Sequence, residues 1–169
     1  RMNVLKYSLK KVFNDTTLIP DGKIRLAWQA MWNNGGSPGV GPRQQTGYNW
    51  WGNPTYSPAG ATSVNSTTLG VNSMKPLQGS ATVDGTHRKN FLDFVGKLTA
   101  DNGTPSHRMF SQADGYMRLT PNSNTSPWST DPGGTGTKGT EYLGCRRNYH
   151  IMMTDGRWNG TATALPDTT

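Results

Sequence analysis

Two stretches near the start of the chain show a regular spacing of hydrophobic residues. Five apolar residues recur three or four positions apart, with lysines mainly on the opposite side: Met2, Leu5, Leu9, Val12 and Phe13. This period predicts an amphipathic helix over about 2–14. After an Asp21-Gly22 turn, apolar and more polar residues alternate over 24–32. The alternation predicts a strand with one strongly apolar face.

The regular pattern is lost from Asn33 to about Gly85, where Gly, Pro, Ser, Thr and Asn dominate. A loop of this length is uncommon inside a compact domain, so we interpret the stretch as a functional insertion between two clear elements. We expect part of it to form short hairpins. Residues 81–83 are a candidate strand remnant.

Two further helices are predicted after this insertion. Thr86 is a suitable N-cap for the first, which runs to about Asp101 and has Phe91, Leu92, Val95 and Leu98 at helical spacing. The second begins at Thr104-Pro105, with Thr as N-cap and Pro at the first helical position. Its apolar side is formed by Met109, Phe110, Ala113, Tyr116 and Met117.

A second polar stretch, about 120–140, leads to a short apolar run over 149–153. The run is too short for a typical helix, which favours a buried central strand. It ends at Asp155-Gly156, and in open α/β sheets functional groups gather at the carboxyl ends of strands. Asp155 is therefore the first candidate for chemistry. The alternative is a turn residue that bonds its own backbone.

The order of elements predicts an α/β fold in which helical crossovers join the strands. The 169 residues are enough for one domain with a core. Two confident strands make a narrow sheet, so we expect further strands on both sides of this sequence. Residues 160–169 are small and polar, and we expect no regular structure there.

Composition narrows the classes of function. The formal charge is +7, but the basic residues lie in short, dispersed groups, which is typical of a solvated surface and argues against a nucleic-acid partner. No apolar run is long enough for a transmembrane helix. Cys145 is the single cysteine. It provides neither a disulfide framework nor a thiolate metal site, so it is a buried thiol or half of a bridge to a partner outside this sequence.

An ordered series of motifs resembles the N-terminal region of the PilC/PilY type IV pilus tip-associated proteins. The motifs are the helix with Phe91, Leu92 and Leu98, then Gly103-Thr104-Pro105, Gly115-Tyr116, Pro127-Trp128, Cys145-Arg146 and Met153-Thr154-Asp155-Gly156-Arg157-Trp158-Asn159. The resemblance is strong over 87–159 and weak over 1–11 and 24–32. It implies a three-layer von Willebrand factor A-like (Rossmann-like) sandwich, truncated at both ends and carrying the long irregular insertion.

The same resemblance implies a metal site. Thr104 and Asp155 would be the second and third elements of a MIDAS-like site for a divalent cation, Mg²⁺ or Ca²⁺. The first element, an Asp-x-Ser-x-Ser loop, would lie upstream of Arg1. One hydroxyl and one carboxylate are far short of the six or more oxygens that such a cation takes, so we expect this chain to bind metal weakly or not at all. Helix capping alone is the alternative role for Thr104.

The function implied by the resemblance is adhesion without catalysis. The intact protein would be secreted and located at the pilus tip or outer cell surface of a Gram-negative bacterium, with roles in pilus biogenesis, surface attachment and surface sensing. Its partners would be minor pilins, other parts of the same tip protein, and a host or abiotic surface ligand.

The aromatic residues of the insertion suggest an alternative. Tyr48, Trp50, Trp51 and Tyr56 could provide the flat rings of a carbohydrate-binding module, or could instead hold the long loop against its own domain. A hydrolase would need a second polar group that converges on Asp155, and the sequence shows no motif-like pair of acid and base.

Overall fold

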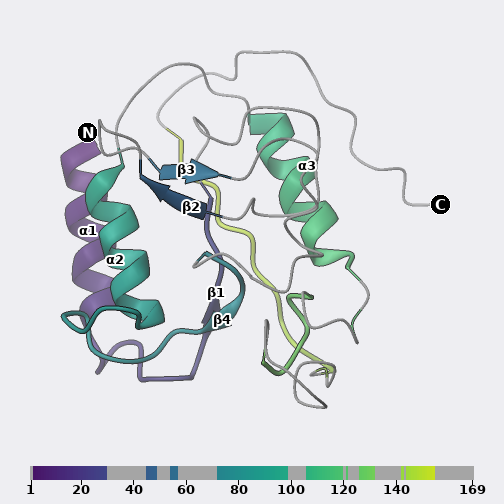
Figure 1. Cartoon of the computed structure of the whole chain (residues 1–169), viewed down its shortest axis with the longest axis horizontal. Helices are drawn as coiled ribbons and strands as arrows, with labels where there is room; N and C mark the ends of the chain where they lie inside the picture. Colours follow the sequence, from purple (N-terminus) through teal and green to yellow (C-terminus); the bar gives the residue numbers. More distant parts are fainter. Residues whose placement is uncertain are drawn as a thin grey trace.

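The computed structural model of the chain describes residues 2–29, 45–48, 54–56, 72–98, 106–119, 121, 126–131, 142 and 144–154. In the described part, helices α1 and α2 lie side by side on one flank and helix α3 lies on the other (Figure 1). The short strands β1 and β4 run between the two flanks. None of the described helices is long and apolar enough to cross a membrane.

The hydrophobic core lies where α1 (Met2–Asn14) packs against α2 (His87–Lys97). Both predicted helices are present, although α2 ends at Lys97 and not near Asp101. Thr86 is the N-cap of α2, where its side chain accepts a hydrogen bond from the Lys89 amide at 3.1 Å. Phe13 of α1 meets Phe91 of α2 with ring centroids 4.7 Å apart. The buried cluster consists of Trp28, Phe91, Leu92, Phe94 and Val95.

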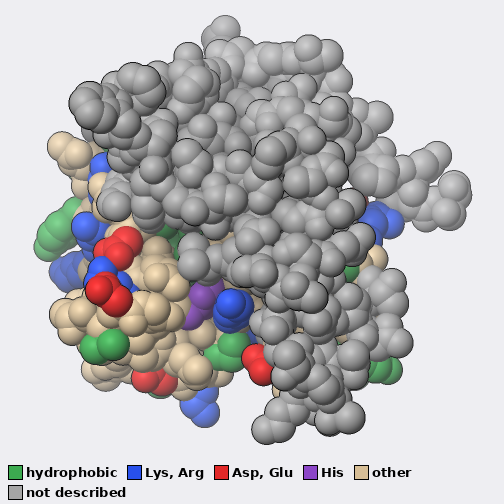
Figure 2. Space-filling model, viewed as in Figure 1, with side chains coloured by type: hydrophobic (Ala, Val, Ile, Leu, Met, Phe, Trp, Pro, Cys, Tyr) green, Lys and Arg blue, Asp and Glu red, His purple; other side chains and the backbone are tan. Residues whose placement is uncertain are grey.

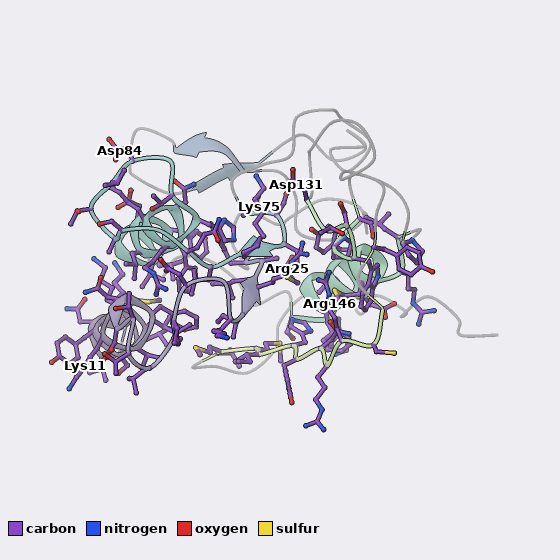
Figure 3. All side chains as sticks on the ribbon, turned by 90° about the horizontal axis from the view of Figure 1, so that it is seen from below. Lys11, Arg25, Lys75, Asp84, Asp131 and Arg146 are labelled. Carbon is purple, nitrogen blue, oxygen red and sulfur yellow. The ribbon has the colours of Figure 1, made fainter. Side chains whose placement is uncertain are left out.

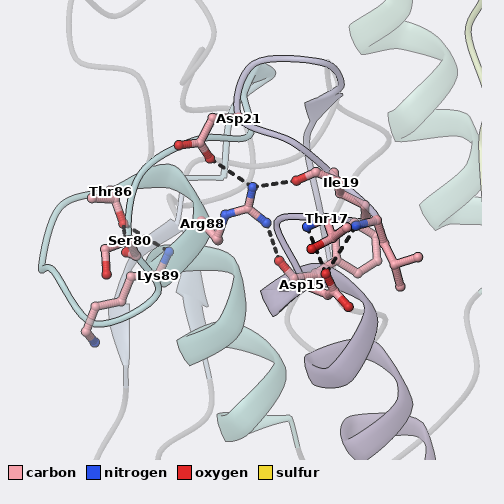
Figure 4. A network of polar contacts seen from close by, with 10 residues as sticks. Asp15, Thr17, Ile19, Asp21, Ser80, Thr86, Arg88 and Lys89 are labelled. Carbon is pink, nitrogen blue, oxygen red and sulfur yellow. Dashed lines mark hydrogen bonds and ion pairs between the residues drawn. The ribbon is translucent and has the colours of Figure 1, made fainter.

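A buried arginine connects α2 to the loop that follows α1 (Figure 4). The Arg88 side chain is fully buried, and its guanidinium donates to the carbonyl oxygens of Phe13 and Ile19, the latter at 2.9 Å. It also forms a salt bridge of 2.9 Å with Asp21. The chain between α1 and β1 is thereby held against the start of α2.

The strand predicted over 24–32 is present in a shorter form. β1 (Arg25–Leu26) pairs antiparallel with β4 (Lys75–Pro76), with Leu26 opposite Lys75. Hydrogen bonds continue on both sides, from the Leu77 amide to Ile24 at 2.9 Å and from the Trp28 amide to Asn72 at 3.3 Å. Residues 30–32 lie outside the described residues.

The last part of the predicted insertion, 33–85, contains β4 and so forms half of this strand pair. Leu77, next to β4, is completely buried, so the last part of the stretch belongs to the packed domain. Residues 81–83 form turns, and the suggested strand remnant there is wrong because their backbone bonds close local turns instead of a ladder.

The expected short hairpin is confirmed in the middle of the insertion. β2 (Gln45–Tyr48) pairs antiparallel with β3 (Pro54–Tyr56), with an irregularity in register between Gln45 and Gly47. Both described strand pairs are antiparallel. Helical crossovers between parallel strands are not among the described features, and the three-layer A-type sandwich remains a prediction.

Helix α3 (Ser106–Met117) confirms the second helix predicted after the insertion. Tyr116, 3% exposed, accepts a hydrogen bond from the Met74 amide at 2.9 Å through its hydroxyl. The Trp128 indole donates to the Met117 carbonyl at 2.8 Å. These contacts join α3, the chain beside β4, and the loop over 126–131. Phe110, predicted on the apolar side of α3, is 41% exposed and stacks on His150.

The buried strand predicted over 149–153 is wrong. This segment forms no strand, and Tyr149 and Ile151 are 80% and 71% exposed. A strand needs a neighbour that supplies ladder hydrogen bonds, and none of the described strands pairs with it. Cys145, which precedes the segment, is also exposed, so it is not a buried thiol. A bridge from Cys145 to a partner outside this sequence stays a prediction.

Candidate functional site

The site residues predicted from the sequence fall mostly outside the described residues. Thr104, Asp155, Trp50 and Trp51 all lie outside them, so the metal site and the central aromatics stay predictions. The other two aromatics, at 48 and 56, lie on the paired strands β2 and β3. Within the described residues, no group of three or more His, Cys, Asp and Glu side chains could hold a metal ion.

Three basic residues from three separate segments lie between the two flanks (Figure 3). They are Arg25 on β1, Lys75 on β4 and Arg146 in the segment over 144–154, and we call them the cationic cluster. β1 and β4 are paired with Arg25 opposite Pro76 and Lys75 opposite Leu26, so Arg25 and Lys75 lie on opposite faces of the strand pair. Each of the three is partly buried.

The two guanidinium groups bind neighbouring backbone carbonyls. Arg25 donates to the Ser129 oxygen at 2.7 Å and to the Met74 oxygen at 2.8 Å, while Arg146 donates to the Trp128 oxygen at 3.2 Å. All of these acceptors are neutral. The cluster is therefore organised around the backbone of the loop over 126–131.

Serine side chains shape that loop. The Ser126 hydroxyl accepts from the Trp128 amide at 3.1 Å, and the Ser129 hydroxyl accepts from the Asp131 amide at 3.2 Å. Such local bonds from side chain to backbone are how serine stabilises turns. Ser126, Pro127 and Ser129 are fully buried, so the carbonyls that receive the arginines sit in a packed part of the chain.

The cluster holds positive charge without a direct counter-charge from the described residues. None of the three basic groups forms a salt bridge with a described carboxylate. Asp131 is exposed, and its charge acts on Arg25 and Lys75 from a longer distance. The buried Nε atoms of Arg25 and Arg146 have no hydrogen-bond partner in the described structure.

Burial lowers the pKa values of the three basic residues of the cluster. Burial, followed by the nearby charge of Arg146, lowers the pKa of Arg25 to about 10. Burial also lowers the pKa of Lys75. A pKa of about 10 still leaves Arg25 protonated at neutral pH, so it keeps a charge that the described residues only partly compensate.

His87 borders the cluster and stays neutral. Its Nε2 lies 2.7 Å from the Leu26 carbonyl, which can only accept, so Nε2 carries the proton. Burial, together with smaller contributions from the charges of Lys75 and Arg25, lowers the pKa of His87 to about 4. At neutral pH the site therefore offers hydrogen-bond donors and positive charge, the chemistry of anion binding.

Sequence reasoning did not find this site. The alternation over 24–32 placed Arg25 on the polar face of a strand, and Lys75 lay within the insertion. Arg146 was part of a motif and of a short basic group that we interpreted as solvated surface. Residues so far apart in the sequence carry no local signal of convergence. The pairing of β1 with β4 places the first two on adjacent strands, and the loop carbonyls hold Arg146 near Arg25.

Comparison with known proteins finds three curated relatives, each a type IV pilus biogenesis factor PilY1 of Pseudomonas aeruginosa. The protein of strain PAO1 is 34% identical over 93 residues, which is 49% of this chain and 8% of the relative. That of strain UCBPP-PA14 is 32% identical over 99 residues, or 57% of this chain and 8% of the relative. That of strain PAK is 32% identical over 81 residues, or 48% and 6%.

The matches are partial on both sides. The aligned part of the chain spans less than a tenth of the length of these relatives. No protein-family model matches the chain, and no solved structure does. The identity over about half of the chain nevertheless supports its relationship to the PilY1 family.

Proposed function

We propose that this chain is part of a type IV pilus-associated protein and contributes to pilus biogenesis. The observation that carries the proposal is the 32–34% identity to three pilus biogenesis factors over about half of the chain. The proposed location is the pilus tip or outer surface of a Gram-negative bacterium. The proposed partners are minor pilins and other parts of the same protein.

Within that role, we propose that the chain is a ligand-binding module without catalytic activity, which serves surface attachment and surface sensing. The two arginines of the cationic cluster support binding, because their guanidinium groups are donors whose described partners are backbone carbonyls. Acid–base catalysis would need a positioned group that titrates near neutral pH. The imidazole of His87, which borders the cationic cluster, is buried and bonded to a backbone carbonyl.

The test is a core substitution in a bacterium that encodes this chain. Phe91→Ala removes a ring from the centre of the cluster between α1 and α2 and should unfold or loosen the module. We expect fewer surface pili by electron microscopy and by immunoblotting of sheared pili, with Lys11→Gln as the surface control. Normal pili with poor attachment would support the adhesive role alone. Normal pili and normal attachment would contradict the proposal.

The metal expectation is tested separately by calorimetry. This chain should bind Mg²⁺ and Ca²⁺ weakly or not at all, whereas a longer chain that includes an upstream Asp-x-Ser-x-Ser loop should bind and should lose binding with Asp155→Ala. A sub-micromolar affinity of this chain by itself would contradict the expectation.

A carbohydrate-binding module is the second candidate. It is favoured by the β2–β3 hairpin, because paired strands that carry Tyr48 and Tyr56 flank the connection that contains Trp50 and Trp51. Replacement of both tryptophans by Ala should then abolish retention on immobilised glycans, while Asp155→Ala should not. If neither change affects retention, the hairpin does not bind glycan.

A further inference from the structure

We propose that the segment 149–153 pairs with the same segment of a second copy of this chain, antiparallel and about a two-fold axis at Ile151. The segment follows Arg146, whose guanidinium group is bonded to the Trp128 carbonyl at 3.2 Å. It runs as an extended trace along the lower margin of Figure 3. The proposal goes beyond pilus biogenesis, because it concerns how two copies of the chain associate.

The backbone of this segment has no ladder partner among the described residues. The structure has no strand over 144–154, and none of the hydrogen bonds between described residues uses a backbone group of 149–153. A row of exposed N–H and C=O groups is a template for pairing with another chain. A second copy can add its own segment as a neighbouring strand and supply the missing hydrogen bonds.

The side chains of the segment are apolar on the face that points away from α3. Alternate side chains of an extended chain point to opposite faces, and His150 stacks on Phe110 of α3. Tyr149, Ile151 and Met153 therefore share the other face, where they are 80%, 71% and 47% exposed. In the proposed register Ile151 meets its own copy and Tyr149 lies opposite Met153. Such cross-strand pairs cover apolar surface, and sulfur packs well against an aromatic ring.

The charges on either side of the segment favour the antiparallel arrangement. Arg147 lies four positions before Ile151 and Asp155 four positions after it, so the two-fold axis places them opposite each other in the two copies. Asp155 lies outside the described residues, and its place here follows from the sequence alone. Arg147 is exposed and forms no salt bridge with a described carboxylate. A parallel arrangement would instead place Arg147 opposite Arg147, which is destabilising.

The size and charge of the chain set the strength of this association. On the described part of the face in Figure 2, hydrophobic side chains are scattered among charged ones, so that face adds no continuous apolar surface. The formal charge of +7 opposes association, but salt at about 0.15 M screens charges more than about 8 Å apart. Five residues from each copy are far fewer than the roughly 20–30 of a standard interface, so we expect a weak dimer with a Kd of about 0.1 mM.

The experiment is sedimentation equilibrium of the full chain from about 10 μM to about 1 mM, on both sides of the expected Kd. Ile151→Lys places two positive charges on the two-fold axis. Arg147→Asp and Asp155→Arg are tested singly and together, because the double reversal restores opposite charges in the same register. Val83→Lys is the matched control, since it adds the same charge at another exposed apolar position outside the segment. Circular dichroism confirms that each variant is folded.

We expect the average mass to rise from 18.4 kDa toward twice that value and no further, because a two-fold interface closes on itself. Ile151→Lys and each single reversal should weaken the dimer at least about fivefold, while the double reversal and Val83→Lys should stay within about twofold of the unchanged chain. A monomer at every concentration, growth beyond a dimer, an equal loss with Val83→Lys, or a double reversal that does not restore the dimer would each overturn the proposal. These outcomes are independent of piliation, which tests the proposed function separately.

Discussion

The two flanks of the molecule use buried arginine in opposite ways. On the α1–α2 flank, Arg88 is completely buried and binds two carbonyls and the carboxylate of Asp21. Between the flanks, Arg25 also binds two carbonyls, but its nearest charged neighbours include another cation, Arg146. Both Arg88 and Arg25 have an Nε without a described partner, so an unpaired nitrogen does not distinguish the two sites.

The counter-charge is what separates a structural arginine from a candidate binding arginine. A buried charge with its own carboxylate is compensated within the protein, and its removal mainly breaks the fold. A partly buried charge that repels its neighbour is compensated only in part, and a ligand can supply the missing charge. The predictions for Arg88 and Arg146 test this difference directly. Those for Phe91 and His87 test the packing of the α1–α2 flank.

The largest effect is expected for Phe91→Ala. The Phe91 ring contacts Phe13 and Trp28 at centroid distances of 4.7 and 5.3 Å, so its loss opens a cavity between three elements. We expect the free energy of unfolding to fall by about 4 kcal/mol, measured by urea denaturation. Phe110→Ala is the matched control, because that ring is 41% exposed and should cost about 1 kcal/mol. Similar losses for the two variants would contradict the assignment of the core.

Arg88→Gln should cost about 3 kcal/mol, because it removes charged hydrogen bonds and leaves the Phe13 and Ile19 carbonyls without their donor. The pKa of Asp21 should also rise toward its ordinary value, since the bond from Arg88 is the main cause of its lowering. Arg118→Gln is the control, because Arg118 forms only an exposed pair with Asp114 and should cost less than about 0.5 kcal/mol. Equal costs would show that burial of Arg88 does not matter.

The third prediction concerns the loss of stability at low pH through His87, which lies between the core and the cationic cluster. The pKa of His87 is about 4 in the folded chain and about 6.5 when unfolded, so the unfolded chain binds the proton more readily. The contribution of neutral His87 to the free energy of unfolding is therefore fully present above about pH 6.5. It is lost as the pH decreases toward 4, by about 3 kcal/mol at most.

Urea denaturation at several pH values checks this prediction. His87→Gln should remove the larger part of the dependence between pH 4 and 6.5, and the rest comes from His150, whose pKa burial also lowers. The lowered pKa values of Asp15 and Asp21 act below their ordinary value of 3.8, outside this window. An unchanged slope in His87→Gln would mean that another group is responsible.

The sequence predicted the helices better than the sites. Helices α1, α2 and α3 follow from periodic apolar residues and from the Thr86 cap, which are local signals. Phe94 was missed, although it lies three positions after Phe91 and is buried with it. The run over 149–153 was assigned to a buried strand because its composition is apolar, but composition does not supply the neighbouring strand. The cationic cluster depends on strand pairing and on a loop carbonyl, and neither is encoded locally.

The smallest effect on stability is expected at the cationic cluster itself, and it is the sharpest test of the comparison. Arg146→Gln removes one bond to a neutral carbonyl and also removes the charge that lowers the pKa of Arg25, so the two contributions oppose each other. The free energy of unfolding should change by less than about 0.5 kcal/mol in either direction, against a loss of about 3 kcal/mol for Arg88→Gln measured under the same conditions. A loss of similar size at both positions would show that Arg146 is as structural as Arg88. A near-neutral change would instead show that the fold does not need this charge.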